Sequence, residues 1–155
     1  MGRKFEKVSR IEEDIQLPIA STENSAGYDF IAIEDVKIKP YSERNPHPTR
    51  VQLGVKAQME PDEVLLLFNR SSNPSKSGLV QANSVGVIDS DYYNNPNNEG
   101  EIAVEFYNMD ISTKHSIVIK KGQKVCQGVF VKFLKTDDDN RLNAKREGGL
   151  GSTGN

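Results

Sequence analysis

The sequence predicts an all-β protein, folded as a sandwich or a barrel. Three observations support this class: apolar and polar residues alternate with a period of two in short segments, turn-forming residues separate those segments, and helical periodicity is scarce. Many short strands at close spacing are typical of β-sandwiches and barrels. At 155 residues the chain is long enough for one domain with its own core, and no internal repeat marks a second unit.

The expected strands differ in how continuously they are apolar. Segments 50–57 and 102–107 alternate, which indicates strands with one buried face. Segments 63–68 and 125–133 are more continuously apolar, as expected for strands covered on both faces. Turns rich in proline, glycine and asparagine separate the segments. The full set of expected strands is 28–33, 50–57, 63–68, 102–107, 116–120 and 125–133.

One short helix and one flexible segment complete the expected organisation. Residues 70–72 supply a serine cap and Pro74 falls in the first turn, so a short helix is expected there. From Asp137 onward the chain is polar, with too few apolar residues to fold alone. We therefore expect a barrel over residues 1–136 and a flexible arm of the same domain over residues 137–155.

Composition excludes several classes of function. The formal net charge of -2 provides no global positive field for gathering nucleic acid or anionic membranes. No apolar run approaches membrane-spanning length. The single cysteine, Cys126, rules out an intramolecular disulfide, and we see no secretory signal, so we expect a cytoplasmic protein. An anionic ligand would have to be bound by a few well-placed groups.

The tail carries the first candidate for anion binding. The glycines of segment 146–154 let the backbone approach an anion closely, while Ser152 and Thr153 add hydroxyl donors. Arg146 adds a charged fork that suits phosphate. The composition is equally typical of a flexible linker. It is not a Walker A loop, because neither the preceding strand nor the closing Gly-Lys-Ser/Thr is present.

Two further segments carry candidate chemistry. In segment 86–92, Asp89 ends an apolar run near Tyr92, which suits a general base beside a stacking surface. The same pattern is also typical of a strand that enters an acidic turn. Segment 69–72 ends a strand before an expected helix N-terminus, a place that favours anions but is also a common helix cap. Segments 25–30 and 122–127 say little alone.

Taken together and in order, these five segments resemble the trimeric, all-β dUTPase family. The resemblance covers the chain from about Leu17 to its end, and is most similar to the long-loop type of Gram-positive bacteria and their phages. It implies a distorted jelly-roll β-barrel and a homotrimer with active sites at subunit interfaces. The implied reaction is hydrolysis of dUTP to dUMP and pyrophosphate with Mg²⁺. The matching segments are 26–29, 70–72, 83–92, 122–127 and 146–154.

The resemblance also implies roles for individual residues. Asp89 would activate the attacking water, and Tyr92 would pack on the deoxyribose and exclude a ribose 2′-hydroxyl. Asp29 would anchor the hydration shell of Mg²⁺ through water. The uracil edge would be read by Asn83 and by the backbone of the hairpin after Tyr92, near Ile102 and Ala103. Val87 and Ile88 would also contact the substrate. The phosphates would be held by Arg70, Ser71 and Ser72 of a neighbouring subunit and by Gln127. The arm residues Arg146, Ser152 and Thr153 would close over them, and Leu150 and Gly151 of the arm would also contact the substrate.

The residues fit this reaction chemically. Phosphoryl transfer needs charge neutralisation and an in-line water more than covalent help. One carboxylate base, a hydrated metal, two arginines and backbone amides supply those parts. No nucleophilic Cys–His or Ser–His pair is required, and His47 and His115 are isolated in the sequence and receive no role.

Three departures from the family pattern are visible. Leu150 stands where the arm normally carries an aromatic residue that stacks on uracil, an interaction worth roughly 1–3 kcal/mol per base. Segment 93–99 lengthens a hairpin that is normally short. Asn69 replaces the small residue or proline that usually precedes the arginine.

Two alternatives follow from the same motifs. A dCTP deaminase has the same barrel and phosphate motifs but needs a different acid–base set near the base, and residues 88–92 favour pyrophosphohydrolysis. A regulatory nucleotide-binding protein would use arm closure as a switch for a protein partner, with the long hairpin as an exposed surface.

Overall fold

The computed structural model describes residues 2–139 and confirms the all-β class. The two short helices are η1 (Asn73–Ser77) and η2 (Ser90–Tyr92). The strands are β1 (Lys4–Lys7), β2 (Ile19–Ala20), β3 (Tyr28–Ile31), β4 (Val36–Ile38), β5 (Thr49–Gln52), β6 (Val55–Gln58), β7 (Glu63–Asn69), β8 (Leu79–Gln81), β9 (Val85–Asp89), β10 (Ala103–Asn108), β11 (Ile117–Ile119) and β12 (Lys124–Lys132).

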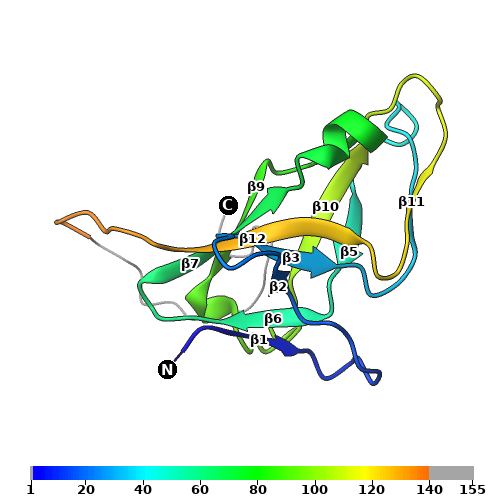
Figure 1. Ribbon diagram of the computed structural model, residues 1–155. Coiled ribbons are helices and arrows are strands. Elements are labelled where there is room, and N and C mark those ends of the chain that lie inside the picture. The colour runs from blue at the N-terminus through cyan, green and yellow to red at the C-terminus, as the bar shows by residue number, and fades with distance from the viewer. Residues whose placement is uncertain (1, 140–155) are drawn as a thin grey trace.

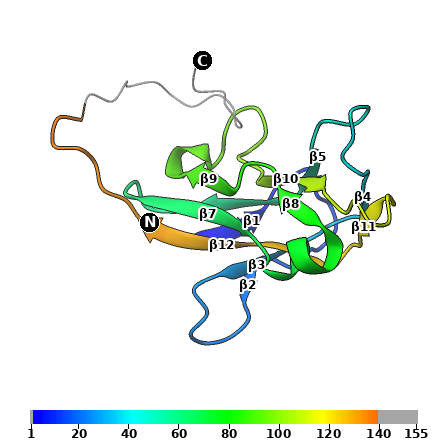
Figure 2. The ribbon, with the colours of Figure 1, turned by 90° about the horizontal axis from the view of Figure 1, so that it is seen from above.

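The strands form antiparallel sheets around one core. The largest sheet has the order β2-β3-β12-β7-β9, and a second has the order β5-β10-β8. The remaining strands form two two-stranded ribbons, β1–β6 and β4–β11. Figure 1 shows β12 crossing the middle of the molecule, with the β1–β6 ribbon on one side of it. In Figure 2 the β4–β11 ribbon and the last described residues lie at opposite ends.

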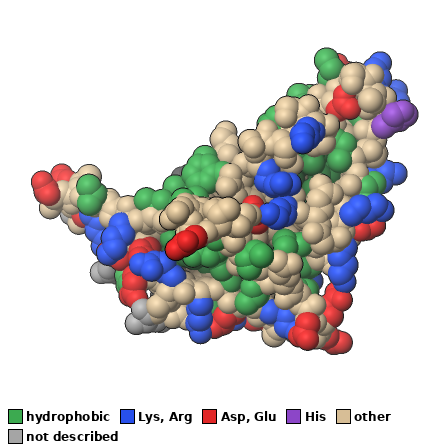
Figure 3. All heavy atoms as spheres, viewed as in Figure 1, with side chains coloured by type: hydrophobic (Ala, Val, Ile, Leu, Met, Phe, Trp, Pro, Cys, Tyr) green, Lys and Arg blue, Asp and Glu red, His purple; other side chains and the backbone are tan. Residues whose placement is uncertain are grey.

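The core lies between the two larger sheets. Phe30, Leu65 and Leu67 come from the five-stranded sheet, and Val51 and Phe106 come from the three-stranded sheet. Each of these side chains is at most 1% exposed, so both sheets bury their inner faces against each other. On the face drawn in Figure 3, positive and negative side chains are interspersed.

The structure corrects the expected strand over residues 50–57. It consists of two strands, β5 and β6, which separate at Gly54 and pair with different partners, β10 and β1. Gly54 has φ +69°, a left-handed conformation that favours glycine. The alternation runs through the break because Leu53 and Val55 both face the core. Periodicity alone therefore cannot reveal where the strand ends.

Two further expectations are wrong in detail. Segments 63–68 and 125–133 were expected to be covered on both faces, but in β7 buried residues alternate with half-buried ones, and Val131 in β12 is 40% exposed. The expected helix is a single π-helical turn, η1, and the Ser72 side chain makes no cap hydrogen bond within the described chain. Gly78, at φ +68°, ends this turn.

Neither helix of residues 2–139 is long and apolar enough to cross a membrane.

Candidate active site

The strand order of the five-stranded sheet brings three predicted residues together. β12 lies between β3 and β7, so Gln127 is directly opposite Asp29 on one side and Phe68 on the other. Arg70 follows the end of β7, and its Nη1 donates to the carbonyl oxygen of Lys124 at 3.2 Å. Asp29, Gln127 and Arg70 therefore meet at one end of the sheet, although they lie far apart in the sequence.

Asp29 is held by two donors at this end. Its carboxylate accepts hydrogen bonds from Lys124 Nζ and from Ser21 Oγ, both at 2.6 Å. Burial opposes its charge, but the hydrogen bonds from Lys124 and Ser21 and the nearby Arg70 outweigh burial, and the pKa of Asp29 lies below its usual value. Sequence reasoning missed Lys124, although it falls within the 122–127 segment. Two cations and one carboxylate make this end of the sheet a polar, charged site.

Close packing under Gln127 explains a glycine of the first matching segment. A Cβ on Gly27 would lie 2.6 Å from Gln127 Oε1, closer than real contacts of that kind. Gly27 therefore lets the Gln127 amide approach the β3 backbone beside Asp29.

Two asparagines hold the loop after β7. Asn73, buried in η1, donates to Asn69 Oδ1 at 2.8 Å and to the Val125 carbonyl oxygen at 3.0 Å. Asn69 Nδ2 in turn donates to the Leu79 carbonyl oxygen at 3.0 Å. These bonds fix both ends of segment 70–72. Asn69, which departs from the family pattern, thus braces the loop that carries the predicted phosphate ligands.

A second group of predicted residues lies on β9 and in η2. Asp89 ends β9 and pairs with Val64 at the beginning of β7. Val87 is 59% exposed and Ile88 is half-buried. Tyr92 is buried, and its hydroxyl donates to the Glu101 carbonyl oxygen at 3.0 Å and accepts from Asn98 Nδ2 at 2.7 Å. The ring is therefore fixed by the loop that follows it.

Asn83 and Ala103 lie on neighbouring segments. Asn83 is exposed in the turn between β8 and β9, and its Oδ1 accepts from Gln81 Nε2 at 3.3 Å. Ala103 begins β10. The pairing of β8 with β10 continues through a hydrogen bond from Ala82 N to the Glu105 carbonyl oxygen at 2.8 Å. This pairing places the Asn83 turn alongside the first half of β10.

The two groups occupy opposite ends of β7. Asp89 is level with Val64, whereas Arg70 follows the far end of the strand. At about 3.4 Å per residue the two backbone positions are roughly 20 Å apart. Residues 2–139 of one chain therefore do not bring Asp89 beside Arg70 and Gln127. The arm residues Arg146, Leu150, Gly151, Ser152 and Thr153 lie outside the described residues.

The charged groups also bear on the expected Mg²⁺. Within residues 2–139, no three His, Cys, Asp or Glu side chains are grouped so that they could hold a metal ion. Asp29 offers one carboxylate with cationic and hydroxyl neighbours. This fits a Mg²⁺ ion that keeps its waters and is carried by substrate phosphates, and it does not fit an all-protein cage.

Comparisons with known proteins place the chain in a family. The family model described as dUTPase matches residues 13–154. The chain is 49% identical over 154 residues to the deoxyuridine 5'-triphosphate nucleotidohydrolase of Lactococcus lactis, covering 98% of this chain and 97% of that protein. It is 31% identical to the Hydrogenobaculum protein of the same name, covering 95% of this chain and 96% of that protein.

Solved structures agree with this result. The structure aligns with the crystal structure of dUTPase from Streptococcus mutans with a TM-score of 0.78 at 46% identity, covering 88% of this chain and 99% of that one. The dUTPase of Staphylococcus phage phi11, at 20% identity and a TM-score of 0.70, shares the fold, with coverage of 93% of this chain and 97% of that one. The expected jelly-roll-like dUTPase fold is thereby confirmed, and the chain belongs to the dUTPase family.

Proposed function

We propose that this chain hydrolyses dUTP to dUMP and pyrophosphate. The observation that carries the proposal is the meeting of Asp29, Gln127 and Arg70 across three strands, with Lys124 beside them. Such a set of one hydrated-metal anchor, two cations and an amide suits a polyphosphate. The Lactococcus relative is named for dUTP hydrolysis, and a Staphylococcus phage 80alpha dUTPase has been solved with dUpNHpp.

The nucleoside would bind along β9 and the beginning of β10. Asn83 would read the uracil edge together with the backbone at Val87, Ile88 and Ala103. The buried ring of Tyr92 would pack on the deoxyribose and leave no room for a 2′-hydroxyl. The two hydrogen bonds on its hydroxyl support this role, because a ring that excludes a small group must not move.

Asp89 would act as the general base. It would accept a proton from water as the water oxygen attacks the α-phosphorus. The bond from that phosphorus to the oxygen bridging the α- and β-phosphoryl groups would break, with its electron pair leaving on pyrophosphate. Arg70, Ser71, Ser72 and Gln127 would hold the phosphates in line. Mg²⁺, bound with the triphosphate, would neutralise phosphate charge, and Asp29 would hold its hydration shell through water.

The separation of the two groups supports a shared site. Because Asp89 and Arg70 lie roughly 20 Å apart on one chain, a triphosphate of one nucleotide would meet Asp89 of one subunit and Arg70 of another. This agrees with the homotrimer that the family resemblance implies. The buried thiol of the single cysteine, Cys126, suits a reducing compartment such as the cytoplasm.

The arm 137–155 would close over the phosphates. Within residues 2–139 the buried apolar core runs from Phe30 to Cys126, and we propose that the barrel folds without the arm. A chain truncated after Asp139 should therefore keep its thermal unfolding midpoint while losing most turnover. A truncated chain that unfolds would make the arm structural and would remove its role as a lid.

A nucleotide panel tests the reaction. The protein with Mg²⁺ is given dUTP, dCTP, UTP and dTTP in turn, and pyrophosphate and ammonia are both measured. We expect pyrophosphate from dUTP alone. Ammonia from dCTP would indicate a deaminase instead, and no turnover of any nucleotide would sink the proposal. Asp89→Asn should still bind dUTP while losing most of its turnover, so binding is measured on the same preparation.

A further inference from the structure

The long loop between η2 and β10 is folded tightly on itself. Asn94 N donates to the Glu99 carbonyl oxygen at 2.9 Å, and Gly100 N donates to Asn98 Oδ1 at 3.0 Å. Gly100 has φ +79°, and a Cβ there would lie 2.1 Å from the Tyr92 carbonyl oxygen. The loop therefore packs against the backbone of Tyr92. The Tyr92 hydroxyl also bonds to Glu101 and Asn98 of this loop, so the loop and the ring are directly linked.

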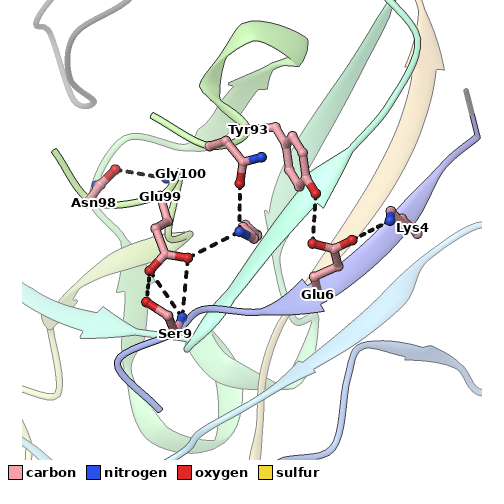
Figure 4. Close-up of polar contacts among 9 residues, drawn as sticks. Lys4, Glu6, Ser9, Tyr93, Asn98, Glu99 and Gly100 are labelled. Atoms are coloured by element: carbon pink, nitrogen blue, oxygen red, sulfur yellow. Dashed lines mark hydrogen bonds and ion pairs between the residues drawn. The ribbon is translucent and has the colours of Figure 1, made fainter. Parts of the chain in front are cut away.

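The N-terminal segment supplies a wall for this loop. In the β1–β6 ribbon, Glu6 lies opposite Lys56. Figure 4 shows the Glu6 side chain pointing toward Tyr93 of the loop, and Lys56 Nζ bonds to Asn94 of the same loop. The Tyr93 hydroxyl donates to Glu6 Oε2 at 2.7 Å. Lys4 pairs with the other carboxylate oxygen of Glu6, so the acceptor is itself held in place. One strand of a peripheral ribbon thus binds the first residue of the loop.

Lys56 links the ribbon to both ends of the loop. Its ammonium donates to Asn94 Oδ1 at 2.6 Å, pairs with Glu99 Oε2 at 3.2 Å, and lies 5.2 Å from the centre of the Tyr93 ring. The Lys56 side chain is 11% exposed. A charge so poorly hydrated needs compensating partners, so the loop and the lysine fix each other.

The residues that follow β1 reach the second half of the loop. Ser9 donates to the Glu99 carboxylate through both its backbone N–H, at 3.2 Å, and its hydroxyl. Arg10 Nε donates to Glu101 Oε2 at 2.7 Å, and Gly54 N donates to Glu101 Oε1 at 3.0 Å. The Glu101 side chain is 6% exposed. The backbone carbonyl of this same glutamate accepts the Tyr92 hydroxyl.

We propose that residues 4–10 form a clasp that positions Tyr92 and thereby sets the selectivity for deoxyribose over ribose. The inference rests on the proposed function, because it requires Tyr92 to face the sugar. A ring that is held in one position excludes a ribose 2′-hydroxyl by steric clash. A ring that can move aside lets the ribonucleotide bind with only a small loss of affinity. Glu6, Ser9 and Arg10 are positioning residues: they act on the sugar through the loop and through Tyr92.

Two matched arginines test the clasp. Arg10→Met removes the partner of Glu101, whose side chain is 6% exposed, whereas Arg50→Met removes a single cross-strand pair, on β5 and β10, with Glu105, whose side chain is 30% exposed. The two arginine side chains are similarly exposed, at 50% and 45%. Steady-state kcat and KM are measured for dUTP on all three proteins. The kcat/KM for UTP, whose turnover is too slow to register in the nucleotide panel, is measured at high enzyme concentration and long incubation, together with hydrogen exchange of the amides of residues 92–101.

For Arg10→Met we expect KM for dUTP to rise and the ratio of kcat/KM for dUTP over UTP to fall by about fivefold or more, because small displacements of positioning groups are costly. Exchange in residues 92–101 should accelerate. Arg50→Met should leave both within about twofold of the wild type, as for an exposed pair. An unchanged selectivity ratio in a folded Arg10→Met protein would overturn the clasp.

A gentler variant guards against misfolding. Tyr93→Phe removes the hydroxyl that donates a hydrogen bond to Glu6, and it leaves the aromatic ring beside Lys56 in place. It should lower the same ratio by a smaller factor, and a ratio equal to that of the wild type would count against the clasp even if Arg10→Met fails to fold. The wild-type control separates the two hypotheses. If it turns over no dUTP, the proposed function fails; if it does and the ratio withstands both substitutions, only the clasp fails.

Discussion

The two ends of β7 are held by different kinds of interaction. Where β7 ends, the loop that carries Arg70 is braced by the neutral amides of Asn69 and Asn73, which bond to each other and to backbone carbonyls. Near its beginning, the loop that follows Tyr92 is held by ion pairs of Glu99 with Lys56 and of Glu101 with Arg10. Neutral bonds are indifferent to salt, and ion pairs are not. At the end where we propose that the phosphates bind (the phosphate end), the Arg70 loop should therefore keep its shape at high salt, although the Asp29–Lys124 pair beside it is itself an ion pair. At the end where we propose that the nucleoside binds (the nucleoside end), the loop that follows Tyr92 should loosen.

The largest expected effect tests whether the two ends serve one site across subunits. Asp89→Asn and Arg70→Ala should each lower turnover by roughly 100-fold or more, as for loss of a general base or an essential phosphate ligand. When the two variants are mixed and allowed to exchange subunits, some sites would receive both intact groups. We expect recovery to at least about a tenth of wild-type turnover for such shared sites.

A mixture that stays as inactive as its components, after subunit exchange has been verified by mass spectrometry, would place both ends of the site in one chain. Mixing two preparations of Asp89→Asn provides the control, since no recovery is then possible.

The neutral brace is the next largest effect. Asn73→Ala leaves Asn69 Oδ1 and the Val125 carbonyl without their donor, and an unmet buried group costs about 1–3 kcal/mol of unfolding free energy. Ser75→Ala removes only an exposed bond of 3.4 Å and should cost under about 0.5 kcal/mol. Urea unfolding at 0.1 and 1 M NaCl measures both. A strong salt dependence of the Asn73→Ala difference would contradict the contrast between the ends.

Gly27→Ala tests Gln127, which lies on β12 at the same end of the sheet as Arg70. The added methyl would meet Gln127 Oε1 at 2.6 Å and displace that amide. We expect KM for dUTP to rise by about three- to tenfold with a smaller change in kcat, because a displaced contact weakens ground-state binding. Calorimetric binding of a nonhydrolysable dUTP analogue checks the direction. Equal affinity in the two proteins would show that Gln127 does not contact the phosphates.

Salt should separate the two ends directly. Raising NaCl from 0.1 to 1 M screens the Glu99–Lys56 pair only in part, because Lys56 is 11% exposed and Glu99 is 37% exposed, and we expect the amides of Asn94 and Glu99 to exchange up to about twofold faster. The amide of Asn73, which bonds to the Arg70 carbonyl oxygen at 3.0 Å, should change less. Equal acceleration at both ends would remove the distinction.

Acid should give the smallest effect, and at the phosphate end. The folded pKa of Asp29 lies below the usual 3.8, since hydrogen bonds from Lys124 and Ser21 overcome burial. Its contribution to stability is therefore fully present above pH 3.8 and is lost as the pH falls through the lower folded value. Thermal midpoints of wild type and Asp29→Asn should converge below that pH. Parallel curves would mean that the pair with Lys124 contributes nothing.

Some of this architecture follows from the sequence, because burial leaves a local pattern. β10 was predicted from its alternation, and β7 from its continuous apolar run. The break at Gly54 was not predicted, because the apolar residues on both sides of it face the same core. Lys124 was also missed, because its partner Asp29 lies on another strand and long-range pairing leaves no local signature.

β1 escaped prediction for a related reason. Lys4, Glu6 and Lys7 make the segment look like a solvated tail, and Phe5 is its one apolar residue. That ring packs 5.4 Å from the rings of Phe30 and Phe130, while Glu6 is used by the loop. A strand with one buried apolar residue and otherwise charged side chains lacks the apolar alternation that predicts a strand. Its contacts with the loop are therefore visible only in the folded structure.

The buried thiol of Cys126 has a practical consequence for labelling. Burial raises the pKa of Cys126 to about 12, so its thiolate is scarce at neutral pH and alkylating reagents should leave it untouched. The natural chain thus serves as a cysteine-free background for attaching a probe. Leu134, at 96% exposure, offers a position just beyond β12 for an introduced cysteine. A fluorophore there would lie between the end of β12 and residue 137, where the proposed arm begins. If the arm closes when nucleotide binds, the emission of this probe should change, although the probe lies outside the proposed site.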